Sequence, residues 1–150
     1  MGQSLSQIYV HLIFSTKERR PWIDGHFQEN MHAYIVGTLR ELNSPSLIVN
    51  SRPEHVHILY RQASTADLSK IVEEVKKSSS KWVKEQSPEH LKFAWQSGYG
   101  AFSVSSSMVE VVKEYIANQK EHHRTTTFKE EFRAFLDKHG VEFDERYVFD

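Results

Sequence analysis

The sequence predicts an α+β fold, in which helices pack on one face of an antiparallel sheet. Two stretches, residues 8–14 and 52–60, alternate apolar and polar residues at the period of a β-strand. Two longer stretches, residues 25–42 and 67–85, repeat apolar residues at helical spacing. A short strand at residues 46–50 and strand-like residues 93–104 complete the order strand, helix, strand, strand, helix, strand. This βαββαβ order is that of ferredoxin-like or RRM-like folds, and the length suits a single domain over residues 1–150.

The strands sort their side chains into two faces, because successive residues of a strand point to opposite sides. In the predicted plan the first and third strands lie side by side at the centre of the sheet. We expect the covering helices to pack on the apolar face, which contains Ile8, Val10, Leu12, Phe14, Val56 and Ile58. We expect the other face to be open and to carry His11, His55 and His57, with Tyr9 and Ile13.

Capping and breaking residues indicate where the predicted helices begin and end. Asn43-Ser44-Pro45 ends the first helix, and Thr65-Ala66-Asp67 offers N-caps for the second. Two further helices follow the last strand, at about residues 107–122 and 127–139. Gly140 stands in the C-cap position of the last one. These two helices are additions to the βαββαβ plan.

Composition excludes several classes of protein and site. Hydrophobic residues make up 39% of the chain and charged residues 26%, as in ordinary globular proteins. No apolar run approaches the ~20 residues of a membrane span. The first residues lack the basic and apolar segments of a secretion signal, so we expect a cytoplasmic protein. The absence of cysteine excludes disulfides, thiolate catalysis and thiolate zinc sites.

Basic residues are unevenly distributed along the chain. The net charge is −1, but residues 1–129 hold 16 Lys and Arg against 13 Asp and Glu, whereas residues 130–150 hold 3 against 7. The main body is therefore mildly basic, and basic clusters can contact DNA phosphates. We expect such contacts from Lys17, Arg19, Arg20 and Arg52. A solvated helix face explains equally well the lysine series Lys76, Lys77, Lys81 and Lys84.

His55 and His57 lie one strand period apart in the segment R-P-E-H-V-H-I-L-Y. Their rings project from one face of the sheet, where two imidazole nitrogens can bind a single divalent ion at about 2.1 Å. Pro53 suits a strand entrance because it lacks an amide proton. The competing interpretation is a pair of polar residues on a solvated face. The spacing alone leaves both interpretations open.

A second group of candidate residues lies on the helix predicted at residues 107–122. One apolar stripe of this helix contains Met108, Val111, Val112 and Tyr115. A tyrosine at the end of such a stripe is commonly a core residue. Here, however, the stripe continues into polar groups that can bind metal or phosphate, namely Gln119, His122 and His123. Tyr115 is therefore a candidate for a core role and for a chemical one.

These segments together resemble a known family. H-V-H after Arg-Pro-Glu resembles the HUH motif of single-strand DNA nucleases. V-K-E-Y-I-A-N-Q is similar to the tyrosine helix of the single-tyrosine HUH transposases of small bacterial and archaeal insertion sequences. Three further segments resemble the same family, namely H-L-I-F-S-T-K-E-R-R-P, W-Q-S-G-Y-G-A-F-S-V-S and the F-D-E-R-Y tail. The resemblance runs in order over essentially the whole chain.

The resemblance implies a DNA transposase that cuts and rejoins single-stranded DNA at element ends marked by hairpins. It implies that His55, His57 and Gln119 bind Mg²⁺ or Mn²⁺, and that Tyr115 attacks a phosphodiester. The products would be a 5′-phosphotyrosine and a free 3′-hydroxyl. The family implies a homodimer, in which the tyrosine helix of one subunit can complete the histidine site of the other. By ligand chemistry alone, His122 is an alternative to Gln119.

Four other functions fit parts of the sequence. A non-catalytic RRM-like nucleic-acid-binding module would stack bases on aromatic residues of the central strands, where this chain has histidines. A histidine-triad hydrolase would need a histidine at the position of Leu59. A replication initiator or relaxase shares the histidine pair but is usually longer. A domesticated HUH nuclease acting on repetitive extragenic hairpins has the same motifs as a mobile transposase, and the sequence does not separate the two.

Overall fold

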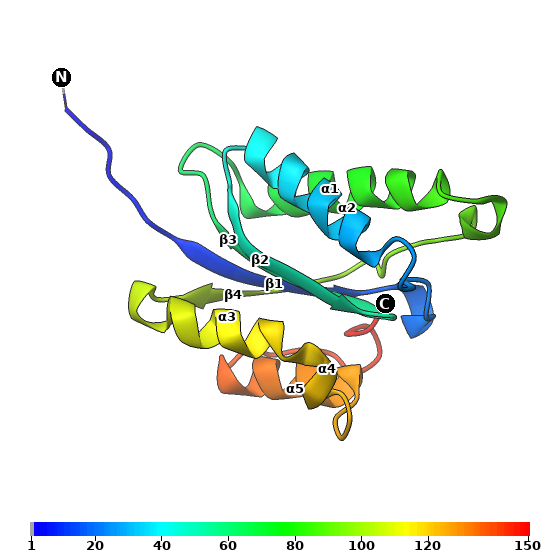
Figure 1. The fold of residues 1–150 in the computed structure, drawn as a ribbon. Helices are drawn as coiled ribbons and strands as arrows, with labels where there is room; N and C mark the ends of the chain where they lie inside the picture. Colours follow the sequence, from blue (N-terminus) through cyan, green and yellow to red (C-terminus); the bar gives the residue numbers. More distant parts are fainter. Residues whose placement is uncertain (1) are drawn as a thin grey trace.

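The computed structural model describes residues 2–150, which form a four-stranded antiparallel sheet with helices on both faces (Figure 1). The strands are β1 (Tyr9–Ser15), β2 (Ser46–Arg52), β3 (His55–Arg61) and β4 (Gly100–Val104). Their order is β2-β3-β1-β4, so β1 and β3 form the central pair. This order confirms the predicted α+β fold and its βαββαβ plan. No helix within residues 2–150 is long and apolar enough to cross a membrane.

Helices α1 (Gln28–Glu41) and α2 (Leu68–Lys84) cover one face of the sheet. Strand alternation places Leu12, Val56 and Ile58 on this face, and all three are fully buried. Their partners in the core include Met31, Ile35 and Leu39 of α1 and Ile71, Val72 and Val75 of α2. The prediction for Ile8 is wrong, because the strand begins at Tyr9 and Ile8 is 52% exposed.

The face predicted to be open is covered by the C-terminal part of the chain. Helices α3 (Val109–Ala117), α4 (Gln119–His122) and α5 (Phe128–Lys138) lie on the side of the sheet opposite α1 and α2 (Figure 1). The side chains of α5 that pack against Ile13 and Phe102 of the sheet are Phe128, Phe132 and Leu136. The prediction of an open face is wrong because Ile13 and Leu59 also point to it, and both are fully buried.

The helix predicted at residues 107–122 is broken at Asn118. It begins with a 3₁₀ turn (Ser106–Met108), continues as α3, and resumes as α4 after Asn118, whose φ and ψ are −98° and 26°. The apolar stripe is also shifted, since Val109 and Ile116 are buried whereas Met108 and Val111 are exposed. A regular helix therefore does not set the relative position of residues 115 and 119.

Helix α5 has nearly the boundaries that its capping residues predict. The Thr127 hydroxyl accepts a hydrogen bond from the Glu130 backbone N–H, and the Glu130 carboxylate accepts one from the Thr127 N–H. This capping box satisfies two N–H groups at the start of the helix. The helix ends just before Gly140, whose φ of +65° favours glycine. Of the strand-like residues 93–104, by contrast, only Gly100–Val104 form a strand.

Candidate metal and tyrosine site

The histidine pair of β3 lies between the sheet and the C-terminal helices. His55 and His57 are fully buried. Nδ1 of His55 is hydrogen-bonded to Oε1 of Glu54 at 2.8 Å, and Nδ1 of His57 to Nε2 of His11, also at 2.8 Å. These bonds orient both rings, so that the two Nε2 atoms face the space under α5.

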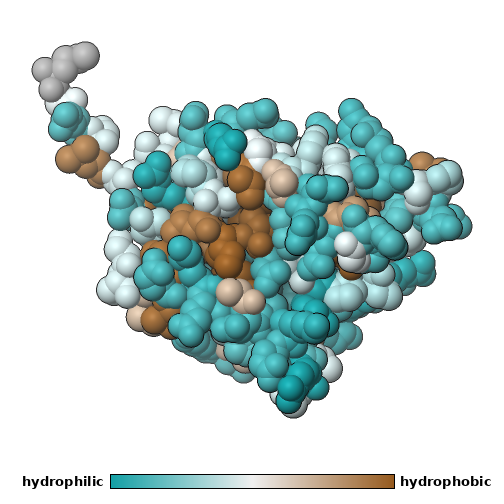
Figure 2. Space-filling view, viewed as in Figure 1, coloured by the Kyte–Doolittle hydropathy of each residue, from teal (hydrophilic) through white to brown (hydrophobic). Residues whose placement is uncertain are grey.

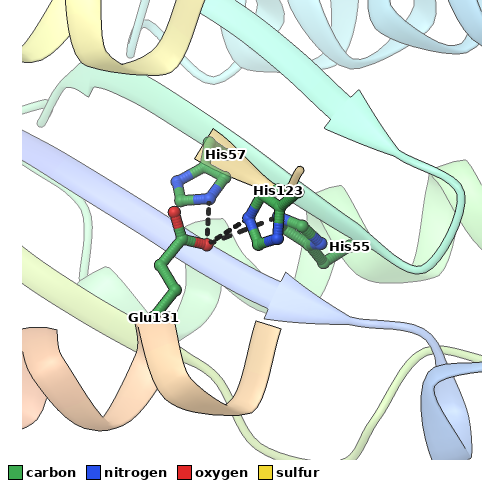
Figure 3. A group of neighbouring side chains, drawn as sticks. All are labelled: His55, His57, His123 and Glu131. Atoms are coloured by element: carbon green, nitrogen blue, oxygen red, sulfur yellow. Dashed lines mark hydrogen bonds and ion pairs between the residues drawn. The ribbon is translucent and has the colours of Figure 1, made fainter. Parts of the chain in front are cut away.

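A carboxylate from α5 meets both rings. Oε1 of Glu131 lies 3.1 Å from Nε2 of His57, 3.5 Å from Nε2 of His55 and 3.0 Å from Nε2 of His123 (Figure 3). The ligand atoms of these four side chains all lie within 4.8 Å of one another. Imidazole nitrogens and a carboxylate oxygen are common metal ligands, so the cluster can hold a divalent ion.

Neither Glu131 nor the contact of His123 with the histidine pair was predicted from the sequence. The sequence contains one indication of Glu131. In α5 it stands between Phe128 and Phe132 on the buried stripe of the helix. A carboxylate is rarely buried unless it is paired. The pattern therefore indicates a buried acidic site, but it does not indicate which groups pair with the carboxylate.

Tyr115 and Gln119 reach the same cluster from α3 and α4. The Tyr115 hydroxyl donates a hydrogen bond to Oε2 of Glu131. The fully buried Gln119 places its Oε1 3.2 Å from Nε2 of His55 and donates from its Nε2 to Oε2 of Glu131 over 3.3 Å. The structure thus brings together, within one chain, all four residues expected for the metal and tyrosine site.

Comparison with known proteins identifies the family. A family model described as "Transposase IS200 like" matches residues 4–119. The chain belongs to the IS200-like transposase family. The fold is shared by a candidate transposase from Deinococcus radiodurans R1, with 18% identity and a TM-score of 0.63 over 79% of this chain and 96% of that one. It is also shared by a REP-associated tyrosine transposase bound to a REP hairpin, with 16% identity and a TM-score of 0.59 over 82% and 74% of the two chains. No curated protein matches the chain.

Some residues of the site lie inside the segment that matches the family model, and others lie after it. The matched segment contains His55, His57 and Tyr115, and it ends at Gln119. His123 and Glu131 lie beyond it. The histidine pair, tyrosine and glutamine therefore belong to the part of the transposase that matches the family, and the carboxylate is supplied by the helix that follows.

His122, the alternative to Gln119, takes a different place in the transposase. Its ring stacks on that of Tyr115, with 4.4 Å between the ring centroids. Its buried Nε2 has no hydrogen-bond partner within residues 2–150. Gln119 faces the histidine pair, whereas His122 lies against the tyrosine ring.

Burial and hydrogen bonding set the protonation of the cluster. Burial lowers the pKa of His57 to about 4, despite the opposing effect of the Glu131 carboxylate. Burial disfavours ionised Glu131, but hydrogen bonds from His123 and His57 hold its pKa well below the usual range. Burial and the Glu131 carboxylate both raise the pKa of Tyr115. At neutral pH the transposase therefore holds a neutral His57 and an ionised Glu131, which are the forms that bind metal.

Two of the four basic residues expected to contact DNA line a cleft beside the cluster. This basic cleft has a volume of about 620 Å³, and its lining includes His123 with Arg19, Arg52, Arg124 and Lys129. Lys17 and Arg20 lie apart, in a smaller cleft of about 250 Å³. Arg20 is also paired with Glu18 at 3.3 Å. The structure thus separates the four predicted residues into two pairs.

A second large cleft reaches Tyr115 between α3 and α5. It has a volume of about 440 Å³ and a largely apolar lining. Besides Tyr115 and Glu131, its lining includes Met108, Val111, Val112, His122 and Phe135. Met108 and Val111, the two exposed residues of the predicted apolar stripe, therefore face this apolar cleft and not the core.

Proposed function

We propose that this IS200-like transposase cuts and rejoins single-stranded DNA with Tyr115 as the nucleophile. The observation that carries the proposal is the hydrogen-bonded cluster around Glu131, where the Tyr115 phenol meets the Gln119 amide and the imidazoles of β3. A phenol has a pKa of about 10 and is a weak nucleophile at neutral pH. The Tyr115 phenol is partly exposed and lies beside side chains that can bind a cation. A cation there would polarise a phosphate, which supports phosphoryl transfer to the phenol.

In the proposed reaction, the Tyr115 oxygen attacks the scissile phosphorus, and the bond from phosphorus to the 3′-oxygen breaks. The phenol loses its proton, the 5′ end becomes a phosphotyrosine, and the departing 3′-oxygen takes up a proton. A 3′-hydroxyl can reverse these steps at a new end, which rejoins the strand. Because the bond energy is kept in the phosphotyrosine, the reaction needs no nucleotide cofactor.

We propose His55, His57 and Gln119 as protein ligands of an Mg²⁺ or Mn²⁺ ion. A bound ion would offset negative charge on the scissile phosphate. The chain prepares this site with Glu54 and His11, which orient the two imidazoles. The Glu131 carboxylate holds the Tyr115 hydroxyl beside the same imidazoles. The nucleophile and the metal ligands are thereby positioned before DNA binds.

We propose that the basic cleft receives the strand next to the scissile phosphate, with Arg19 and Arg52 contacting its phosphates. The apolar cleft beside Tyr115 suits an unstacked base. Lys17 and Arg20, which lie farther along the surface, would contact the folded part of the substrate. The REP-associated tyrosine transposase of the same fold is bound to a REP hairpin. We propose hairpin-bearing single strands as the substrate of this chain as well.

We propose that the transposase forms a homodimer through the β2 edge of its sheet. β2 is an edge strand, and Figure 2 shows a hydrophobic patch over β2 and α3 within a largely hydrophilic surface. Leu47 and Ile48 of β2 are partly exposed. We expect light scattering to give twice the monomer mass for the wild type and the monomer mass for Ile48→Lys. A monomeric wild type would contradict the dimer.

A domesticated nuclease acting on repetitive extragenic hairpins is the second candidate function. The fold shared with a REP-associated tyrosine transposase favours it, and its chemistry would use the same residues. The genomic DNA around the gene discriminates the two functions. Hairpins that flank the gene on both sides would indicate a mobile element. Hairpin repeats scattered through the genome would indicate the domesticated enzyme.

Covalent trapping tests the proposed nucleophile. The protein is incubated with Mg²⁺ or Mn²⁺ and end-labelled single strands that carry hairpins, and denaturing gels detect a protein–DNA adduct. We expect an adduct with the wild type and with Tyr34→Phe, a control on α1 across the sheet. We expect none with Tyr115→Phe, and an adduct there would overturn the assignment. No adduct with any hairpin substrate would favour the non-catalytic RRM-like binding module.

A further inference from the structure

We propose that the segment after the family match completes the metal centre. Glu131 of α5 serves as an anionic fourth protein ligand beside His55, His57 and Gln119, and His123 adds a further imidazole. We infer that this ligand set selects Mn²⁺ over Mg²⁺. The inference rests on the proposed function only in taking His55, His57 and Gln119 as metal ligands.

The distances within the cluster are those of neighbouring ligands in a coordination shell. With metal–ligand bonds of about 2.1 Å, adjacent ligand atoms lie about 3.0 Å apart in an octahedral shell and about 3.4 Å apart in a tetrahedral one. Oε1 of Glu131 lies 3.0 Å, 3.1 Å and 3.5 Å from the Nε2 atoms of His123, His57 and His55. The carboxylate therefore needs no large movement to share an ion with the imidazoles.

The atoms around His55 also suit a shared cation. The Glu54 carboxylate is hydrogen-bonded to Nδ1 of His55 at 2.8 Å and orients the ring. Nε2 of the same ring faces two oxygens, Oε1 of Gln119 at 3.2 Å and Oε1 of Glu131 at 3.5 Å. An imidazole nitrogen, an amide oxygen and a carboxylate oxygen therefore converge on one point, where a divalent ion can bind all three.

The position of the carboxylate is held by the packing of α5 on the sheet. Helix α5 is anchored to the sheet by Phe128, Phe132 and Leu136, and the Thr127 capping box fixes its start. Glu131 itself is only 5% exposed. A buried carboxylate on an anchored helix is preorganised as a ligand, because little side-chain entropy is lost when an ion binds.

The proposed ligand set determines the preference between Mn²⁺ and Mg²⁺. Mg²⁺ prefers oxygen ligands in a near-ideal octahedral shell, whereas imidazole ligands favour transition metals. A site that combines imidazoles with one carboxylate and one amide oxygen is therefore expected to bind Mn²⁺ at least about tenfold more tightly than Mg²⁺. Equal affinities for the two ions would contradict this selectivity.

A Mn²⁺ titration without DNA tests the inference. Metal-free protein is titrated with MnCl₂, and the electron paramagnetic resonance signal of free Mn²⁺ gives the Kd. We expect Glu131→Gln to raise the Kd at least about tenfold. Asp137→Asn removes an exposed carboxylate from the same helix and should leave the Kd unchanged. Any smaller effect of Glu131→Gln, or an equal effect of the control, overturns the inference. Competition with Mg²⁺ measures the selectivity in the same experiment.

Two further variants separate this inference from the proposed function. If His57→Ala abolishes Mn²⁺ binding while Glu131→Gln has no effect, the metal centre stands and only the role of Glu131 fails. If His57→Ala also retains full affinity, or the wild type binds no Mn²⁺, the metal centre itself fails. Thermal unfolding of metal-free samples shows whether Glu131→Gln is folded. If it is not, Glu131→Asp withdraws the carboxylate by about 1.5 Å, and the same tenfold criterion applies.

Discussion

The Tyr115 hydroxyl donates its hydrogen bond to Oε2 of Glu131, and this bond links α3 to α5 across the site. The other oxygen of the same carboxylate lies among three imidazole nitrogens. One buried side chain thus connects the proposed nucleophile with the proposed metal ligands. A displacement of α5 is therefore expected to affect both groups.

The variant Tyr115→Phe should separate chemistry from stability. It removes one donor from Glu131, which keeps hydrogen bonds from His57, His123 and Gln119. We expect the free energy of unfolding to fall by about 1 kcal/mol. Strand cleavage should be lost, because the attacking oxygen is absent. Urea denaturation and cleavage gels measure the two effects, and a loss of several kcal/mol would mean that the phenol mainly serves the fold.

The variant Gly100→Ala should displace α5 from the sheet. A Cβ atom at Gly100 would lie 2.6 Å from Cε2 and 2.9 Å from Cζ of Phe132. We expect a loss of about 1–3 kcal/mol in the free energy of unfolding and weaker Mn²⁺ binding, because Glu131 moves with the helix. In the control Gly37→Ala the new Cβ meets nothing within 4 Å, and α1 should gain about 0.5–1 kcal/mol. Wild-type stability and wild-type Mn²⁺ affinity in Gly100→Ala would refute this prediction.

The metal-free protein should lose stability as the pH falls from 6.5 to 4.5. His57 has a pKa of about 6.5 in the unfolded chain, and burial lowers the pKa to about 4 in the folded state. Within this window the unfolded state binds more protons, so His57 alone removes about 2 kcal/mol of stability by pH 4.5. The groups that face His57 are His11, His55, His123 and Glu131.

The pKa of His123 is raised despite burial, by hydrogen bonding to Glu131, and this offsets part of the loss. Urea titrations of the chelator-treated protein at several pH values measure the slope of stability against pH. The variant His57→Gln carries no titratable ring and should flatten the slope. An equally steep slope in this variant would show that other groups cause the acid sensitivity.

The affinity for single-stranded DNA should depend on salt through Arg19 and Arg52. Each phosphate contact on a single strand contributes about 0.7 to the slope of log K against log salt concentration. We expect the double change of both arginines to glutamine to reduce the slope by about 1.4. The matched change of Lys77 and Lys81 on α2 should leave it unaltered. Fluorescence anisotropy over a range of salt concentrations measures the slopes, and a larger effect of the lysines would place the DNA on the α2 face.

Local sequence patterns predicted the sheet and the helices on its first face. The predicted ranges 25–42 and 67–85 differ by at most three residues at each end from α1 (Gln28–Glu41) and α2 (Leu68–Lys84). The pairing of β1 with β3 followed from the order of the elements. The predicted open face was wrong, because alternation shows which residues share a face but not what covers it. The break at Asn118 was missed as well, since the segment contains no proline or glycine that would mark it.

The sequence by itself determined the order of the elements, the two faces of the sheet and the spacing of His55 and His57, because these depend on residues close together in the chain. The tertiary structure decided that Glu131 joins this pair, across a separation of 74 residues from His57. Helix α5 returns over the sheet because its apolar stripe is buried against Ile13 and Phe102. Hydrophobic burial is non-directional, so only the packed fold determines which polar groups meet beneath that helix.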